Sequence, residues 1–387
     1  MIPRIATKKL LELATKFPIV SVIGPRQSGK TTLVRAAFPN YQYFSLETPD
    51  VRKRAEEDPR LFLESIVKNG VILDEVQRVP SLFSYLQTFV DENKKMGQCI
   101  LTGSHNFLLL EQISQTLAGR VGFIQLLPLS LEELRQASLL PDSLYKILYS
   151  GMYPPIYDRD INPQDWYPNY IATYVERDVR MIKNIPDLSK FQTLLKLCAG
   201  RIGQVVNFSS LAADCGVSTN TVKSWISILE ASFILFLLRP YYKNFNKRVT
   251  KQAKIYFYDT GLLCSLLGIQ NPGQVETHYA RGSIFESFIV SEILKYNLDR
   301  GKKPEIYFWR DHRGDEVDVI IEQGERLTAV EIKAGHTFSS DYFSALKRFQ
   351  TTADVSKDAT FVIYSGSESQ EYSDGYLLSW KEMQKIF

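Results

Sequence analysis

The chain has 387 residues, of which 44% are hydrophobic and 23% charged, and its formal net charge is +3. These are ordinary values for a globular protein, and the length predicts two or three domains. The charge is too small to indicate nucleic-acid binding by itself. The longest apolar run, Phe233–Leu238, is too short to span a bilayer, and residues 1–4 lack the apolar core of a signal peptide. A cytoplasmic protein without membrane contact is expected.

Residues 1–130 alternate β-rich runs with helical patterns, which predicts an α/β domain built on a parallel sheet. The first expected strand leads into a loop of the pattern G-x-x-x-x-G-K-[ST], and a helix follows it. In such a loop the backbone N–H groups surround phosphate oxygens, a lysine meets the β- and γ-phosphates, and a threonine binds Mg²⁺. The expected strands are 18–23, 41–46, 71–74, 98–102 and 122–127. The residues expected to bind the nucleotide are Gly24, Pro25, Arg26, Gln27, Ser28, Gly29, Lys30, Thr31 and Thr32.

Two acids close the third expected strand, Val71-Ile72-Leu73-Asp74-Glu75. Alone, such a pair is often only a turn, but after a phosphate loop it indicates catalysis. Asp74 would hold Mg²⁺ together with Thr31, and Glu75 would orient or deprotonate the attacking water. At the end of the fourth strand, Ser104, or otherwise Thr102, is expected to sense the γ-phosphate.

Arg120 follows in the segment Leu117-Ala118-Gly119-Arg120. An arginine here has two interpretations. It completes the catalytic site of a neighbouring subunit as an arginine finger, or it makes a salt bridge within its own chain.

A helical linker is expected over residues 131–189, with breaks at Pro141, Pro154-Pro155 and Asn162-Pro163 and a charged helix at 170–180.

Residues 190–258 are expected to form a winged-helix domain. A short helix at 208–214 and a longer one at 219–233 are separated by a tight turn with glycine, and Ser218 caps the second helix. Six basic residues and no acid lie between Arg239 and Lys254, with aromatic residues among them. This segment either contacts DNA or RNA or is a solvated hairpin.

The last part, residues 259–387, is expected to be a second α/β domain. Asp318 lies in one strand, and Glu331 and Lys333 share a face of the next because they are two residues apart. If the strands pair, Asp318 and Glu331 form a metal site, and Lys333 activates water for phosphodiester attack. Solvent-facing strand pairs give the same pattern.

Glu286, on an expected helix upstream, could add a further acid to this site. Asp315 and Glu316 are expected to be turn residues.

The chain resembles bacterial and archaeal ATPases of the AAA+ superfamily that carry a C-terminal region of uncharacterised function, itself similar to the PD-(D/E)XK nuclease fold. The resemblance spans nearly the whole chain, and its ATPase motifs are the specific ones. Val317 departs from the proline in the name of the nuclease motif. The motifs are at 24–31, 73–75, 101–104 and 117–120, and at 257–261, 282–286, 316–318 and 330–333.

Two functions are compatible with these features. The first is a Mg²⁺-dependent ATPase that couples ATP binding or hydrolysis to nucleic-acid processing through a nuclease-like domain. The second is a nucleotide-dependent switch whose C-terminal fold is a non-catalytic interaction platform. Either protein could be a homo-oligomer.

Overall fold

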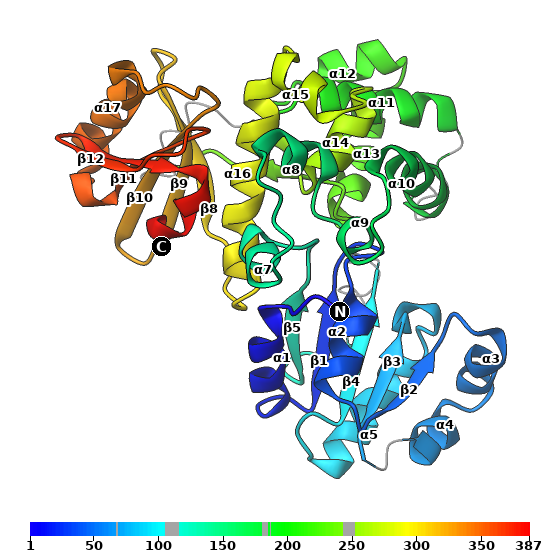
Figure 1. Ribbon diagram of the computed structural model, residues 1–387. Coiled ribbons are helices and arrows are strands. Elements are labelled where there is room, and N and C mark those ends of the chain that lie inside the picture. Colours follow the sequence, from blue (N-terminus) through cyan, green and yellow to red (C-terminus); the bar gives the residue numbers. More distant parts are fainter. Residues whose placement is uncertain (67–68, 105–115, 180–184, 186, 243–251) are drawn as a thin grey trace.

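The computed structural model describes residues 1–66, 69–104, 116–179, 185, 187–242 and 252–387. It has three parts: an N-terminal sheet with its helices, a helical middle, and a C-terminal sheet (Figure 1). Helix α16, Arg281–Leu298, runs between the helical middle and the C-terminal sheet (Figure 1).

The N-terminal sheet is parallel throughout and has the order β2-β3-β4-β1-β5. Its side chains alternate between two apolar cores, because successive residues of a strand point to opposite faces. Ile19 and Leu101 belong to one core, and Val20 and Ile100 belong to the other. All five predicted strands are confirmed, as β1 Ile19–Ile23, β2 Gln42–Ser45, β3 Val71–Asp74, β4 Cys99–Gly103 and β5 Val121–Gln125. The accompanying helices are α1 Ala6–Ala14, α2 Lys30–Ala37, α3 Pro49–Glu57, α4 Pro59–Ile66, η1 Val76–Arg78 and α5 Leu82–Asn93.

The helical middle is one packed unit, since a single core runs through all its helices and on to α16. Helices α9 and α10 begin at the predicted proline breaks, where a proline in the first turn loses no hydrogen bond. The predicted boundaries at 189 and 258 fall inside this core and stay a prediction. The elements are α7 Leu131–Gln136, α8 Leu144–Ser150, α9 Pro154–Asp158, α10 Pro163–Tyr170, a π-helix Ile171–Val179, α11 Leu188–Gly200, α14 Thr260–Leu266 and α15 Pro272–Thr277.

The predicted helix–turn–helix elements are present as α12 Phe208–Cys215 and α13 Thr219–Ala231. Gly216 ends α12 in the left-handed conformation, and the Ser218 side chain caps α13. Two antiparallel strands follow, β6 Leu235–Leu238 and β7 Lys254–Phe257. The winged-helix assignment stays a prediction. Most of the basic segment between the strands, residues 243–251, lies outside the described residues.

The C-terminal sheet has the order β12-β13-β11-β10-β9-β8, with α17 on one face and α16 against the other. Strands β9 and β10 are antiparallel neighbours, so the condition set for the second site, that these strands pair, is met. Glu316 was expected in a turn, and this is wrong: it is the first residue of β9. The elements are α16 Arg281–Leu298, β8 Ile306–Arg310, β9 Glu316–Gln323, β10 Arg326–Lys333, η3 Ser340–Phe343, α17 Ser344–Ala353, η4 Lys357–Ala359, β11 Thr360–Tyr364, β12 Gln370–Tyr372, β13 Gly375–Ser379 and η5 Trp380–Ile386.

Candidate nucleotide-binding site

The glycine-rich loop joins β1 to α2, and its two glycines are required by the backbone. Gly29 has φ 93°, in the region that favours glycine. A Cβ on Gly24 would lie 2.0 Å from the carbonyl oxygen of Leu126, so only glycine fits there. The loop therefore lies tightly against the start of the segment that follows β5.

Lys30 is buried, and its ammonium group donates to two carbonyls of the loop itself. Its Nζ lies 2.9 Å from the Gly24 oxygen and 2.7 Å from the Pro25 oxygen. Burial lowers the pKa of Lys30 to about 8, although the carboxylates of Glu75 and Asp74 oppose this shift. The Ser28 hydroxyl is also buried, and it has no hydrogen-bond partner in the described part of the chain. A loop with a cation and an unsatisfied hydroxyl is chemically suited to an anion.

Three hydroxyl groups surround the Asp74 carboxylate. Thr31 Oγ1 lies 3.2 and 3.3 Å from its two oxygens, Tyr43 Oη donates to Oδ2 at 2.6 Å, and Thr102 donates to Oδ1. Thr31 and Asp74, in an open pocket, are a fitting donor set for Mg²⁺, which prefers oxygen ligands and retains several waters. Tyr43 was missed in the sequence, although β2 pairs with β3 and so brings this side chain to the acid.

Glu75 follows β3 directly and has φ 55°, which turns its side chain back toward β4. Its carboxylate accepts from Ser104 Oγ at 2.9 Å and from the Gln77 amide. The two residues expected as alternatives at the end of β4 thus contact different acids. Thr102 contacts Asp74, and Ser104 contacts Glu75.

The pocket around this loop is bounded on its other side by α9 of the helical middle. Arg159, which follows α9, lines it and makes no ion pair among the described residues. Only the proline pair that starts α9 pointed to this segment in the sequence. The pocket residues are Arg26, Gln27, Gly29, Lys30, Thr31, Thr32, Glu47, Asp74, Glu75, Pro154, Pro155, Asp158 and Arg159.

Arg120 makes a two-pronged salt bridge with Asp91, with nitrogen–oxygen distances of 2.6 and 2.8 Å. It immediately precedes β5, whose first residue pairs with the first residue of β1. Arg120 therefore lies near the N-terminal ends of the strands, whereas the phosphate loop of its own chain lies at their C-terminal ends. Within its own chain Arg120 makes the expected salt bridge, and its role as an arginine finger in a neighbouring subunit stays a prediction.

A buried ionic network joins the phosphate loop to α7 and α16. Arg4 donates to the Ser28 oxygen at 2.6 Å and to the Leu127 oxygen at 2.7 Å, and it pairs with Glu133 at 2.9 Å. Glu133 is fully buried and caps the start of α7.

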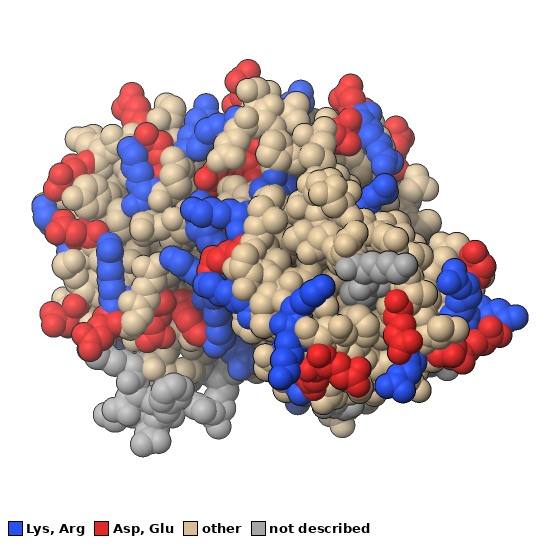
Figure 2. Space-filling model, turned by 90° about the horizontal axis from the view of Figure 1, so that it is seen from below, with Lys and Arg blue, Asp and Glu red and all other residues tan. Residues whose placement is uncertain are grey.

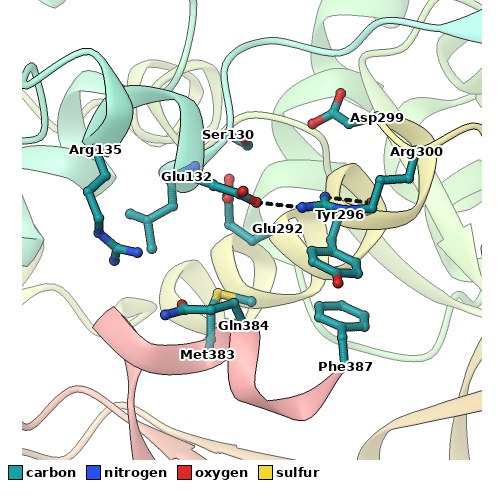
Figure 3. Close-up of a pocket in the computed structure, with 11 residues that line it drawn as sticks. Ser130, Glu132, Arg135, Glu292, Tyr296, Asp299, Arg300, Met383, Gln384 and Phe387 are labelled. Carbon is teal, nitrogen blue, oxygen red and sulfur yellow. Dashed lines mark hydrogen bonds and ion pairs between the residues drawn. The ribbon is translucent and has the colours of Figure 1, made fainter. Parts of the chain in front are cut away.

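Where α7 meets α16, Glu292 accepts from the Leu131 backbone at 2.7 Å and pairs with Lys295. Figure 3 shows the small pocket there, between α7, α16 and the C-terminal η5 segment. The N-terminal domain is thus fixed to α16 by buried charges.

In the C-terminal sheet, the structure brings together all three residues of the predicted second site. Asp318 accepts from the backbone of Ile332, and Lys333 Nζ lies 2.6 Å from Glu331 Oε1. Burial, and then the neighbouring Asp318, raise the pKa of Glu331 to about 8.

Glu286 lies near these residues, and Lys254 forms ion pairs with Glu286 and with Asp318. Lys254 was counted with the basic segment that could contact nucleic acid, and for this residue the expectation is wrong, because it is only 2% exposed. Within the described residues, no three His, Cys, Asp or Glu side chains are placed to hold a metal. As arranged here, the acids do not fit the expected metal.

Three family models match successive parts of the chain. Residues 16–135 match an AAA domain, residues 141–273 a domain of unknown function (DUF8612), and residues 281–383 another domain of unknown function (DUF4143). The N-terminal part is an AAA-like ATPase domain. Its family supports nucleotide binding or hydrolysis.

The chain is also similar over most of its length to uncharacterized proteins of several organisms. One from Mycobacterium tuberculosis is 29% identical over 379 residues, covering 96% of this chain and 82% of the relative. One from Methanocaldococcus jannaschii is 23% identical, covering 88% and 80%. A solved Walker-type ATPase of Pyrococcus abyssi aligns with 67% of this chain and 94% of its own, at 14% identity and a TM-score of 0.45. Among the described residues, no helix is long and apolar enough to cross a membrane.

Proposed function

We propose that the AAA-like domain binds ATP with Mg²⁺ and hydrolyses its terminal phosphoanhydride bond. The observation that carries the proposal is one pocket containing Lys30, Thr31, Asp74 and Glu75. A phosphate-binding cation, two oxygen ligands for Mg²⁺ and a carboxylate base are the parts that phosphoryl transfer to water requires.

Each side chain has a separate role in this proposal. Lys30 leaves the carbonyls of Gly24 and Pro25 and pairs with the β- and γ-phosphates. Thr31 and Asp74 hold Mg²⁺, which when bound neutralises charge on the phosphate oxygens. Glu75 orients the water that attacks the γ-phosphorus, and ADP leaves as the phosphoanhydride bond breaks. Ser104 positions Glu75 through the hydrogen bond between them.

The first prediction separates binding from hydrolysis. Lys30→Ala removes the cation that meets the phosphates, and ATP affinity should drop by about a hundredfold. Glu75→Gln removes only the base, so ATP should still bind while phosphate release falls by about a hundredfold or more. Calorimetry and a phosphate-release assay measure the two effects. Undiminished ATP affinity in Lys30→Ala would refute the assignment.

The second prediction concerns Arg159. Its guanidinium lines the pocket without an ion pair in the described part of the chain, and it would stabilise the charge that develops on the γ-phosphate. Arg159→Ala should lower the rate of phosphate release by about tenfold or more, with a smaller effect on ADP affinity. Arg326→Ala, at an exposed position of β10, is the matched control. Equal rates in the two variants would exclude this role.

We further propose that ATP binding or hydrolysis alters the C-terminal domain. Two functions of that domain are compatible with this proposal. Nucleic-acid processing predicts that DNA or RNA binds and stimulates phosphate release, and that neutralising Lys247, Arg248 and Lys251 flattens the salt dependence of binding. An interaction platform predicts no such effect. The platform is favoured by the ion-paired acids of the C-terminal sheet and by the mixture of basic and acidic side chains on the face in Figure 2.

A further inference from the structure

The C-terminal acids already have a cation, and it comes from another part of the chain. Lys254 is the first residue of β7 in the helical middle. Its Nζ lies 3.3 Å from Glu286 Oε1 and 3.7 Å from Asp318 Oδ1, and it also pairs with Glu316. These acids belong to α16 and β9, so one ammonium group connects three elements.

The burial of Lys254 indicates that its position is built into the fold. Its side chain is 3% exposed, and the Glu286 carboxylate also accepts from Tyr256, two residues along the same strand. A buried ammonium group is stable only when it is fully paired, and here three carboxylates surround it. A contact of this kind excludes other cations from the space between the acids.

One oxygen of Glu331, near these acids, is free to accept a further cation. Glu331 binds Lys333 through Oε1, whereas its Oε2 is buried and has no hydrogen-bond partner among the residues that the structure describes. Glu331 lies beside Asp318 on the neighbouring strand, as the register of β9 and β10 requires. With Lys254 withdrawn, the carboxylates of Glu286 and Asp318 would lose the ammonium group that they share, and Glu331 would remain beside Asp318.

We propose that Lys254 is an internal plug that occupies the cation position of the C-terminal acids and keeps divalent metal out. The plug also connects β7 of the helical middle to α16 and to β9 of the C-terminal sheet. Metal binding and this contact between the parts exclude each other. The C-terminal domain is then closed to metal-dependent chemistry until the contact opens.

The test measures binding of Mn²⁺, added as MnCl₂ to the full chain without nucleotide. Lys254→Met removes the plug, and Mn²⁺ should then bind about tenfold tighter or more than to the unaltered protein, because no lysine has to be displaced. Adding Asp318→Asn should abolish this gain. Lys302→Met, an exposed lysine with no ion pair in the described part of the chain, is the control for the change of charge.

Lys254→Met leaves buried acids unpaired and could fail to fold. The double variant Lys254→Met/Glu316→Gln removes one charge of each sign and keeps Glu286, Asp318 and Glu331. It should gain the same Asp318-dependent Mn²⁺ binding. Asp318-dependent binding of equal strength in the unaltered protein would overturn the proposal, and so would a folded double variant that binds no Mn²⁺. Loss of ATP binding in Lys30→Ala bears only on the nucleotide site.

Discussion

At the scale of single residues, the nucleotide site is organised by hydroxyl groups that hold its acids. Asp74 has three such partners, and Glu75 has Ser104. Each carboxylate is therefore fixed before a ligand arrives, which reduces the reorganisation needed when charge develops on the phosphate. Lys30 is the exception, because its bonds to Gly24 and Pro25 must be exchanged for bonds to phosphate.

The third prediction follows from the lowered pKa of Lys30. In the free protein this pKa is about 8, and bound phosphate raises it because an anion stabilises the ammonium form. Binding therefore takes up a proton above pH 8, so ATP affinity should be steady below that pH and fall by up to about tenfold per unit above it. Calorimetry between about pH 7 and 9.5 measures this dependence. Lys30→Ala should lack it, and a slope retained in that variant would assign the effect to another group.

At the scale of elements, one buried acid at the start of α14 joins three segments of the helical middle by hydrogen bonds. Asp259 accepts from the Met152 backbone at 2.6 Å, from Tyr167 Oη at 2.7 Å and from the Leu262 backbone at 2.8 Å. These bonds fix the segment between α8 and α9 against α10 and α14. The position of α9, and so of Arg159 over the phosphate loop, depends on them.

The fourth prediction compares two glycines with positive φ, of which Gly151 has ψ −161° and so lies outside the left-handed helical conformation. A Cβ on Gly151, at φ 64°, would lie 2.0 Å from Tyr167 Oη and 2.5 Å from Asp259 Oδ1, whereas one on Gly268, at φ 76°, meets nothing within 4 Å. Gly268→Ala should cost about 1–2 kcal/mol of unfolding free energy through backbone strain alone. Gly151→Ala should cost more, because the methyl group also displaces the buried pair. Urea unfolding measures both, and equal losses would show that the contact with Tyr167 adjusts freely.

At the scale of the whole molecule, buried ionic groups connect parts that are far apart in the sequence. Arg4 and Glu133 tie the phosphate loop to α7, and Glu292 with Lys295 ties α7 to α16. Breaking one partner of a buried pair leaves a charge that water cannot reach, so such groups are costly to remove singly. These buried contacts connect the phosphate loop to α16, which packs against the C-terminal sheet.

The fifth prediction tests this connection by a double-mutant cycle. Arg4→Met should lower the unfolding free energy by about 3–5 kcal/mol, because Glu133 stays buried without its partner. Arg4→Met/Glu133→Gln should recover part of that loss, and urea unfolding of both single variants and the double variant completes the cycle. Strictly additive losses would contradict a coupled pair. Arg326→Met is the exposed control.

The sequence by itself determined the N-terminal sheet and the main residues of its site. The glycine-rich loop and the acids after β3 are local patterns, because backbone conformation and strand ends place Lys30, Thr31, Asp74 and Glu75 with few contacts from elsewhere. The sequence left the pairing of β9 with β10 as a condition, and the structure meets it. Glu316 was misplaced in a turn because it belongs to β9 through its pairing with Arg310 of β8, which the neighbouring residues do not reveal.

Only the tertiary structure decided which distant side chains meet these local motifs. Tyr43 reaches Asp74 because β2 pairs with β3, and α9 places Arg159 in the pocket of the phosphate loop. Lys254, although it ends a basic segment of the sequence, is buried among acids. None of these contacts has a pattern in the neighbouring residues, because long-range packing and charge pairing create them. Short sequence motifs therefore determine the chemical groups of the nucleotide site, whereas long-range packing determines how the site is connected to the rest of the molecule.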